Sequence, residues 1–193
     1  MPLGSIDDHY APPSPELSQL LRLRDSGDEN LNDALSDLGY RLLADDDAPT
    51  LLHPDSYLSE AERADPSIAA NIVAIDEVCA QISFFAEDDQ SNLFGYWHGP
   101  ERTALAAAAI VKFDNEGQFS LLQGRGLIEA LIGDRVFDDD EAFAEHAQAF
   151  EALGFAVAVR SWHDLVDPDA ASDPAKCHEA GYERALPGFE SPR

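Results

Sequence analysis

Four short, apolar and β-prone runs, residues 82–86, 93–97, 109–113 and 119–122, most constrain the fold of this chain. Polar loops join the runs within each pair, and the second loop, Asp-Asn-Glu-Gly, is a typical hairpin turn. In the second pair the apolar residues alternate with polar neighbours, so one face of this hairpin should be buried. Strands joined by such short loops predict an antiparallel sheet.

Helical patterns flank these runs on both sides. Two of the patterns begin with an N-cap residue followed by proline, at Ser14 and at Asp65. Glycines at 27 and 39 are suited to ending the first two helices. The apolar spacing predicts helices that begin near residues 15, 30, 66, 127 and 138, with one helical turn at 59–62.

Two more strands are expected outside the central region. Residues 41–43 form a short apolar run, and Phe155, Val157 and Val159 alternate with other residues in a last strand. Together these elements predict an α+β fold with a central, mostly antiparallel sheet of about five or six strands flanked by helices. The length of 193 residues suits one domain.

The two ends of the chain are polar and rich in proline. We predict a flexible N-terminal tail at residues 1–13, one α+β domain at 14–166 and a C-terminal tail at 167–193. No basic region followed by an apolar one precedes the first helix, and no run approaches the length needed to cross a bilayer. The interpretation is therefore a cytoplasmic protein, with Cys79 and Cys177 as reduced thiols.

Charge is the unusual feature of the composition. The chain has 12 Lys and Arg against 38 Asp and Glu, a formal net charge of −26. Such a surface repels nucleic acid and anionic membranes, and it attracts basic proteins. Solubility alone, or an acid-rich proteome, is an equally good explanation of the same charge.

Catalytic and metal-binding motifs are not evident. The six histidines show no ligand spacing, the acidic runs lack the pattern of a calcium loop, and no nucleophile motif occurs. The Gly-Arg-Gly sequence at 124–126 lacks the lysine of a phosphate-binding loop, so a strand-to-helix turn is the better interpretation. We predict no enzyme activity, no metal and no cofactor.

A candidate contact surface is formed by aromatic and acidic residues. Aromatic anchors ringed by acidic groups suit the centre of a protein interface, although strand aromatics more often fill cores. The alternative is therefore that Trp97 belongs to the core and His98 to an ordinary loop. The candidate contact residues are Tyr96, Trp97, His98, Glu87, Asp88, Asp89, Asp138, Asp139 and Asp140.

The central region resembles the SUKH superfamily, named for fungal cell-wall-synthesis regulators and related bacterial proteins. The resemblance is carried by FFAEDDQSNLFGYWHG, by the hairpin IVKFDNEGQF and by the following GRGLIEALI. The N-terminal PELSQLLRLRDSG loosely matches the opening helix of the family. The chain departs from the family at Ser14, where a leucine often precedes the proline, and in the alanine run at 104–109, where a proline is more typical.

This resemblance implies an α+β fold and, for a bacterial member, a non-enzymatic immunity protein. Such a protein binds and neutralises a cognate toxin by occlusion, and many of these toxins are nucleases with basic surfaces. The expected partner is a protein, possibly a basic toxin domain, and not nucleic acid or membrane. The alternative is an acidic regulatory or scaffold protein that binds endogenous partners.

Overall fold

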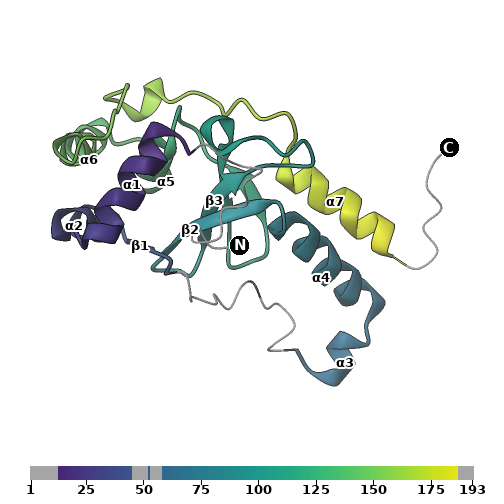
Figure 1. The fold of residues 1–193 in the computed structure, drawn as a ribbon. Helices are drawn as coiled ribbons and strands as arrows, with labels where there is room; N and C mark the ends of the chain where they lie inside the picture. The colour runs from purple at the N-terminus through teal and green to yellow at the C-terminus, as the bar shows by residue number, and fades with distance from the viewer. Residues whose placement is uncertain (1–12, 45–51, 53–57, 187–193) are drawn as a thin grey trace.

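The computed structural model describes residues 13–44, 52 and 58–186, which form an α+β fold with helices on both faces of an antiparallel sheet (Figure 1). The strands are β1 (Tyr40–Leu42), β2 (Ile82–Asp88), β3 (Leu93–Trp97), β4 (Ala109–Phe113) and β5 (Phe119–Leu121). The α-helices are α1 (Pro15–Ser26), α2 (Glu29–Asp37), α3 (Glu60–Arg63), α4 (Pro66–Cys79), α5 (Leu127–Arg135), α6 (Asp140–Ala152) and α7 (Pro174–Ala185). Two short 3-10 helices, η4 (Leu105–Ala107) and η5 (Trp162–Asp164), complete the described elements.

The sheet is an up-and-down arrangement in which every strand lies beside its neighbours in sequence. Its order is β1-β2-β3-β4-β5 and every pairing is antiparallel. The fold class predicted from the sequence is therefore confirmed. Gly95 of β3 is needed where β2 bulges, because a Cβ atom there would overlap Ile82 and lie 2.9 Å from the carbonyl oxygen of Ser83.

Both faces of the sheet are covered, and each cover makes its own hydrophobic core. Phe94 and Tyr96 of β3 belong to the first core, which also takes residues from α1, α2, α5 and α6. Leu93 and Trp97 belong to the second core, which contains Ile75 and other residues of α4. Because side chains alternate along a strand, β3 supplies both cores at once.

Helix α7 occupies the segment that the sequence predicted to be a C-terminal tail. It runs beside α4 on the second face of the sheet (Figure 1), where the buried Gly181 lies against Ala74. His178 bonds to Asn71 over 3.0 Å, and Arg184 forms an ion pair with Glu77. The two helices run in opposite directions (Figure 1), because α7 begins beside the sheet near the end of α4, and these two side-chain contacts lie on either side of the close approach of Gly181 to Ala74.

The predicted tail at 167–193 is therefore wrong for residues 174–185, and the folded domain extends beyond residue 166. The predicted N-terminal tail at 1–13 lies outside the described residues except for Pro13. The predicted strand at 155–159 is also absent. Its backbone pairs with no other strand, although Phe155, Val157 and Val159 are buried and the residues between them are exposed.

Among the described residues, no helix combines the length and the apolar character needed to cross a membrane.

Candidate protein-binding surface

The aromatic residues expected at the contact surface are core residues. Tyr96, Trp97 and His98 have exposed fractions of 3%, 2% and 1%. The indole Nε1 of Trp97 donates a hydrogen bond to the carbonyl oxygen of Ser172, 3.0 Å away, in the segment that leads into α7. The structure thus corrects the expected exposure of these three side chains, because Trp97 lies in the second core under α4 and α7, Tyr96 lies in the first core, and His98 is enclosed by its contacts with Ser83 and Thr103.

His98 makes a buried polar pair that the sequence analysis missed. Its Nδ1 lies 2.7 Å from the carbonyl oxygen of Thr103, which only accepts, so this nitrogen carries the proton. Its Nε2 lies 2.8 Å from Ser83 Oγ and therefore accepts from the hydroxyl. Burial lowers the pKa of His98, consistent with a neutral ring.

Ser83 and His98 have the hydrogen-bond arrangement of an activated serine, but Ser83 has an exposed fraction of only 5%. A substrate has no access to a hydroxyl group between the sheet and its helical cover. The pair therefore stabilises the end of the β2–β3 hairpin.

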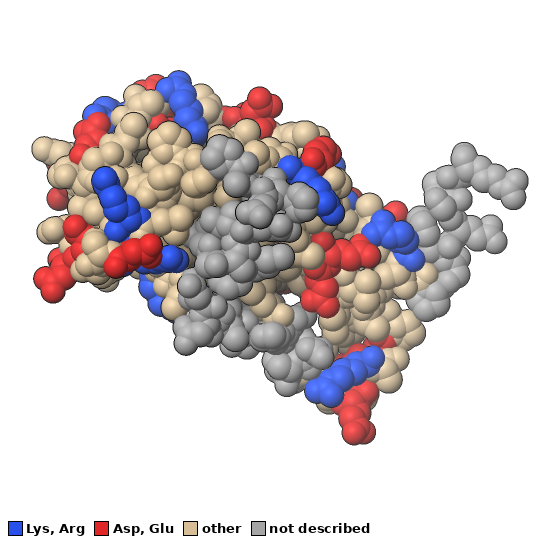
Figure 2. Space-filling model, viewed as in Figure 1, with Lys and Arg blue, Asp and Glu red and all other residues tan. Residues whose placement is uncertain are grey.

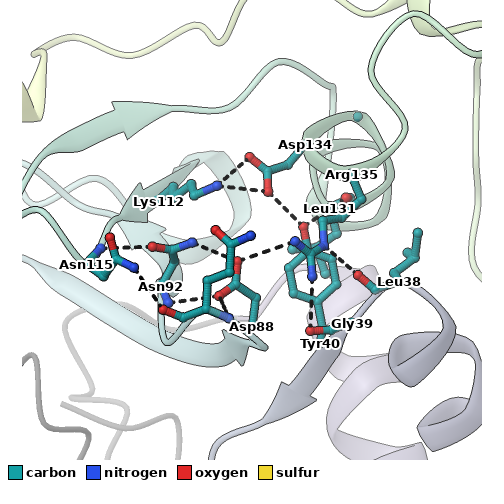
Figure 3. A network of polar contacts seen from close by, with 12 residues as sticks. Leu38, Gly39, Tyr40, Asp88, Asn92, Lys112, Asn115, Leu131, Asp134 and Arg135 are labelled. Carbon is teal, nitrogen blue, oxygen red and sulfur yellow. Dashed lines mark hydrogen bonds and ion pairs between the residues drawn. The ribbon is translucent and has the colours of Figure 1, made fainter.

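The acidic residues of the β2–β3 turn do not form one exposed cluster. Asp88 is buried, and its carboxylate accepts hydrogen bonds from the backbone amide of Gln90 and from the backbone and side-chain amides of Asn92, at 2.8–2.9 Å. Asn92 Oδ1 in turn accepts from the amide of Asn115 in the next hairpin turn (Figure 3). Glu87 is half-buried and pairs with Arg41, so among the predicted acidic residues of this turn Asp89 is the exposed one.

Arg135, at the end of α5, ties this turn to the helical layer (Figure 3). Its Nε donates to the carbonyl oxygen of Leu38 over 2.6 Å, and its guanidinium lies 3.7 Å from the Asp88 carboxylate and 5.2 Å from the ring centre of Tyr40. Its hydrogen bond to Asp89 lowers the pKa of that carboxyl group.

The remainder of this network centres on the hydroxyl of Tyr40 (Figure 3). The Tyr40 hydroxyl lies 3.1 Å from both the Leu131 carbonyl oxygen and the Asp134 carboxylate, and Lys112 contacts the same carboxylate at 3.1 Å. The last turn of α5 is consequently fixed to three strands of the sheet.

An exposed aromatic residue follows directly on this fixed turn. Phe137 has an exposed fraction of 73%, the largest among the exposed large hydrophobic residues of the described chain. Its ring meets the ring of Trp162 edge to face, with centroids 4.6 Å apart. Three exposed carboxylates follow Phe137 in the chain, those of Asp138, Asp139 and Asp140. We call Phe137, Trp162 and these three carboxylates the aromatic–acidic patch.

Asp140 joins the two segments of the patch. Its carboxylate accepts hydrogen bonds from Ser161 Oγ at 2.7 Å and from the amide of Trp162 at 2.9 Å, and these bonds lower its pKa. His163 lies 3.3 Å from Asp138 and 3.6 Å from Asp140. The indole of Trp162 donates to the carbonyl oxygen of Gly133 over 3.1 Å, so the ring beneath Phe137 is held by α5.

Asp138, Asp139 and Asp140, together with Asp89, are thus the predicted contact residues that the structure leaves exposed. The sequence analysis did not select Phe137 or Trp162. The run Phe-Asp-Asp-Asp at 137–140, an aromatic residue next to three charges, was the signal that could have found the patch.

The described cavities offer no convergent catalytic groups. The one beside α1, of about 510 Å³, is bordered by Glu16 and Glu129. Glu16 accepts hydrogen bonds from the amides of Leu127 and Ile128, and burial raises its pKa. Glu129 accepts from the amides of Arg125 and Ala158 at 2.9 and 2.7 Å, so backbone amides occupy both carboxylates.

The same contacts explain the Gly-Arg-Gly sequence. It forms the predicted strand-to-helix turn before α5, and the carboxylate of Glu16 fills the position in which a phosphate would bind. The described part of the chain contains no group of three or more His, Cys, Asp or Glu residues arranged to hold a metal ion.

Charged side chains are dispersed over the face of the molecule drawn in Figure 2. Small groups of acidic residues lie there beside Lys or Arg, with uncharged surface between the groups. Within the described residues, ion pairs with acidic side chains hold Arg24, Arg41, Lys112, Arg135, Arg160 and Arg184. Each of these pairs neutralises one cation and one carboxylate, so the formal net charge of −26 is unchanged by the pairing.

Comparisons with protein families, with curated proteins and with solved structures gave no match to this chain.

Proposed function

We propose that this chain is a non-enzymatic immunity protein that binds a basic toxin and neutralises it by occlusion. The observation that carries the proposal is the acidic excess of the chain, 38 Asp and Glu against 12 Lys and Arg, which gives a formal net charge of −26. A surface of this kind attracts a basic protein from a distance. The resemblance of the central hairpins to the SUKH superfamily supports a toxin as the partner.

The proposed mechanism is steric and electrostatic. A nuclease toxin holds its substrate through Lys and Arg side chains, because these neutralise phosphates. An acidic protein that covers the same residues competes directly with nucleic acid. The Coulombic attraction between the two proteins also accelerates their encounter, and added salt slows it.

The test is co-expression of the chain with the product of the neighbouring gene. A toxin–immunity pair gives growth that depends on this chain, and the two proteins copurify as a complex whose association slows as salt is raised. A complex without any effect on growth would favour the regulatory or scaffold alternative. If neither a complex nor rescue of growth is found, the immunity proposal is wrong.

A further inference from the structure

The aromatic–acidic patch combines features of a protein-binding hot spot. Large aromatic residues at an interface contribute most when a partner covers them completely, and Phe137 is largely uncovered in this chain. Its ring packs against Trp162 with centroids 4.6 Å apart, and the rest of the ring is open to a partner. The nearby carboxylates of Asp138, Asp139 and Asp140 favour a positively charged partner over Phe137.

The patch is also rigid, which favours binding. Asp139 caps α6 by accepting the amide of Ala142 over 3.0 Å, and Asp140 holds the backbone of Trp162. Asp138 has a left-handed backbone, with φ at 58°, and Asp tolerates this conformation better than most residues. A surface that is ordered before binding loses little conformational entropy when a partner docks.

We infer that the aromatic–acidic patch docks a basic segment of a partner protein, one that presents an apolar side chain flanked by Arg or Lys. This inference rests on the proposed function and assigns its contact site. The apolar side chain covers Phe137 and the exposed edge of Trp162, and the flanking cations pair with the three carboxylates. Arg is favoured over Lys because its planar guanidinium both stacks on aromatic rings and binds carboxylates through two parallel hydrogen bonds.

Two short synthetic peptides of equal positive charge test the inference. Both contain arginines, and one has leucines where the other has serines. We expect the leucine peptide to bind about tenfold more tightly. It should change the fluorescence of Trp162 and the amide chemical shifts of residues 136–141 and 161–165, whereas the buried Trp97 should not respond.

The decisive variant is Phe137→Ser, which should abolish the preference for the leucine peptide without lowering the unfolding midpoint. The matched control is Val73→Ser on α4, an exposed apolar residue with an exposed fraction of 46%, which should leave the preference unchanged. The inference is overturned if the peptides bind equally or not at all. It also fails if they perturb the acidic residues of α2 and α3 as strongly as the patch.

Failure of this site and failure of the immunity function are separable. If Phe137→Ser still rescues growth in the co-expression test, the function stands and the contact surface lies elsewhere. If the unchanged chain gives no rescue, the function fails whatever the peptides show.

Discussion

Replacement of Arg135 by Ala should destabilise the fold more than loss of any surface ion pair. The guanidinium donates to the carbonyl oxygen of Leu38 at 2.6 Å, lies over the Tyr40 ring and faces the buried carboxylate of Asp88. A hydrogen bond from a charged group contributes about 1.5–3 kcal/mol, and the cation–π contact about 0.5–1 kcal/mol. The contact with exposed Asp89 adds little because water and salt screen it.

The expected loss is about 3 kcal/mol in the free energy of unfolding, a large part of the roughly 5–15 kcal/mol typical of a domain. For a chain of this size the corresponding fall in Tm is roughly 6–12 °C. Urea unfolding followed by circular dichroism measures the free energy, and calorimetry measures the Tm. Arg135→Lys should lie between Ala and the native residue, because Lys keeps the charge and loses the planar fork.

The control is Arg184→Ala, which removes an ion pair with Glu77 whose side chains are 61% and 46% exposed. Its expected effect is at most about 1 kcal/mol. Gly39 supplies a second check, because φ is +77° there and a Cβ atom would overlap the guanidinium of Arg135. Gly39→Ala should therefore be less harmful in the Arg135→Ala background than alone. Equal losses for Arg135→Ala and Arg184→Ala would refute the reasoning.

Three further predictions concern His98 and helix α7. The free energy of unfolding should fall as the pH drops below about 6.5, because His98 takes up a proton in the unfolded chain while burial keeps its pKa lower in the folded protein. The variant His98→Gln should therefore show a smaller change in the urea midpoint between pH 7 and about 5. Gly181→Val should lower the free energy of unfolding by about 1–3 kcal/mol, measured with urea, since a Cβ atom at this position lies 3.3 Å from the Cβ of Ala74. The control Ala180→Val, at an exposed position, should lower it by about 0.5 kcal/mol through helix propensity alone. A chain that ends at residue 173 should lose cooperative unfolding and bind a hydrophobic dye, because Phe119 loses its contact with His178; unchanged cooperativity would contradict this role for α7.

The sequence predicts the central sheet well because its signals are local. The turn between β4 and β5 carries its own chemistry: the Asp114 carboxylate accepts hydrogen bonds from the amides of Glu116 and Gln118 at 3.0 and 2.8 Å, and Gly117 has a φ of +83°. The starts of α1 and α4 follow from Ser14 and Asp65, whose side chains cap the helices as expected. Such features depend on neighbours in the chain and need no knowledge of the tertiary fold.

The misassigned strand shows the limit of an alternating pattern. Phe155, Val157 and Val159 do face the core, so the period of two correctly indicates an extended segment with one buried side. Pairing is a separate matter, because it depends on where the backbone amides find acceptors. The amide of Ala158 donates to the buried carboxylate of Glu129, and Arg160 donates to the carbonyl oxygens of Val157 and Val159. Side chains thus supply bonds that a neighbouring strand would otherwise make.

The missed helix had a local signal too. Asp173 and Pro174 start α7 in the same way that Asp65 and Pro66 start α4, and Asp173 accepts the amide of Ala175 at 3.0 Å. What hid the helix was its low apolar content. Its packing relies on small residues, with Gly181 against Ala74, so close approach of the backbones replaces large side chains.

This omission also explains why Trp97 is buried. Without α7, the second face of the sheet has only α4 to cover it, and Trp97 then looks available to a partner. With α7 in place, the indole of Trp97 bonds to Ser172 and the side chain is enclosed, whereas Tyr96 lies in the first core and His98 is buried against Ser83 and Thr103. Asp138, Asp139 and Asp140 lie at the start of α6, away from that cover, and stay exposed. The aromatic anchor beside them is Phe137, and it lies at the end of α5 because the contacts of Arg135 fix the turn that precedes it.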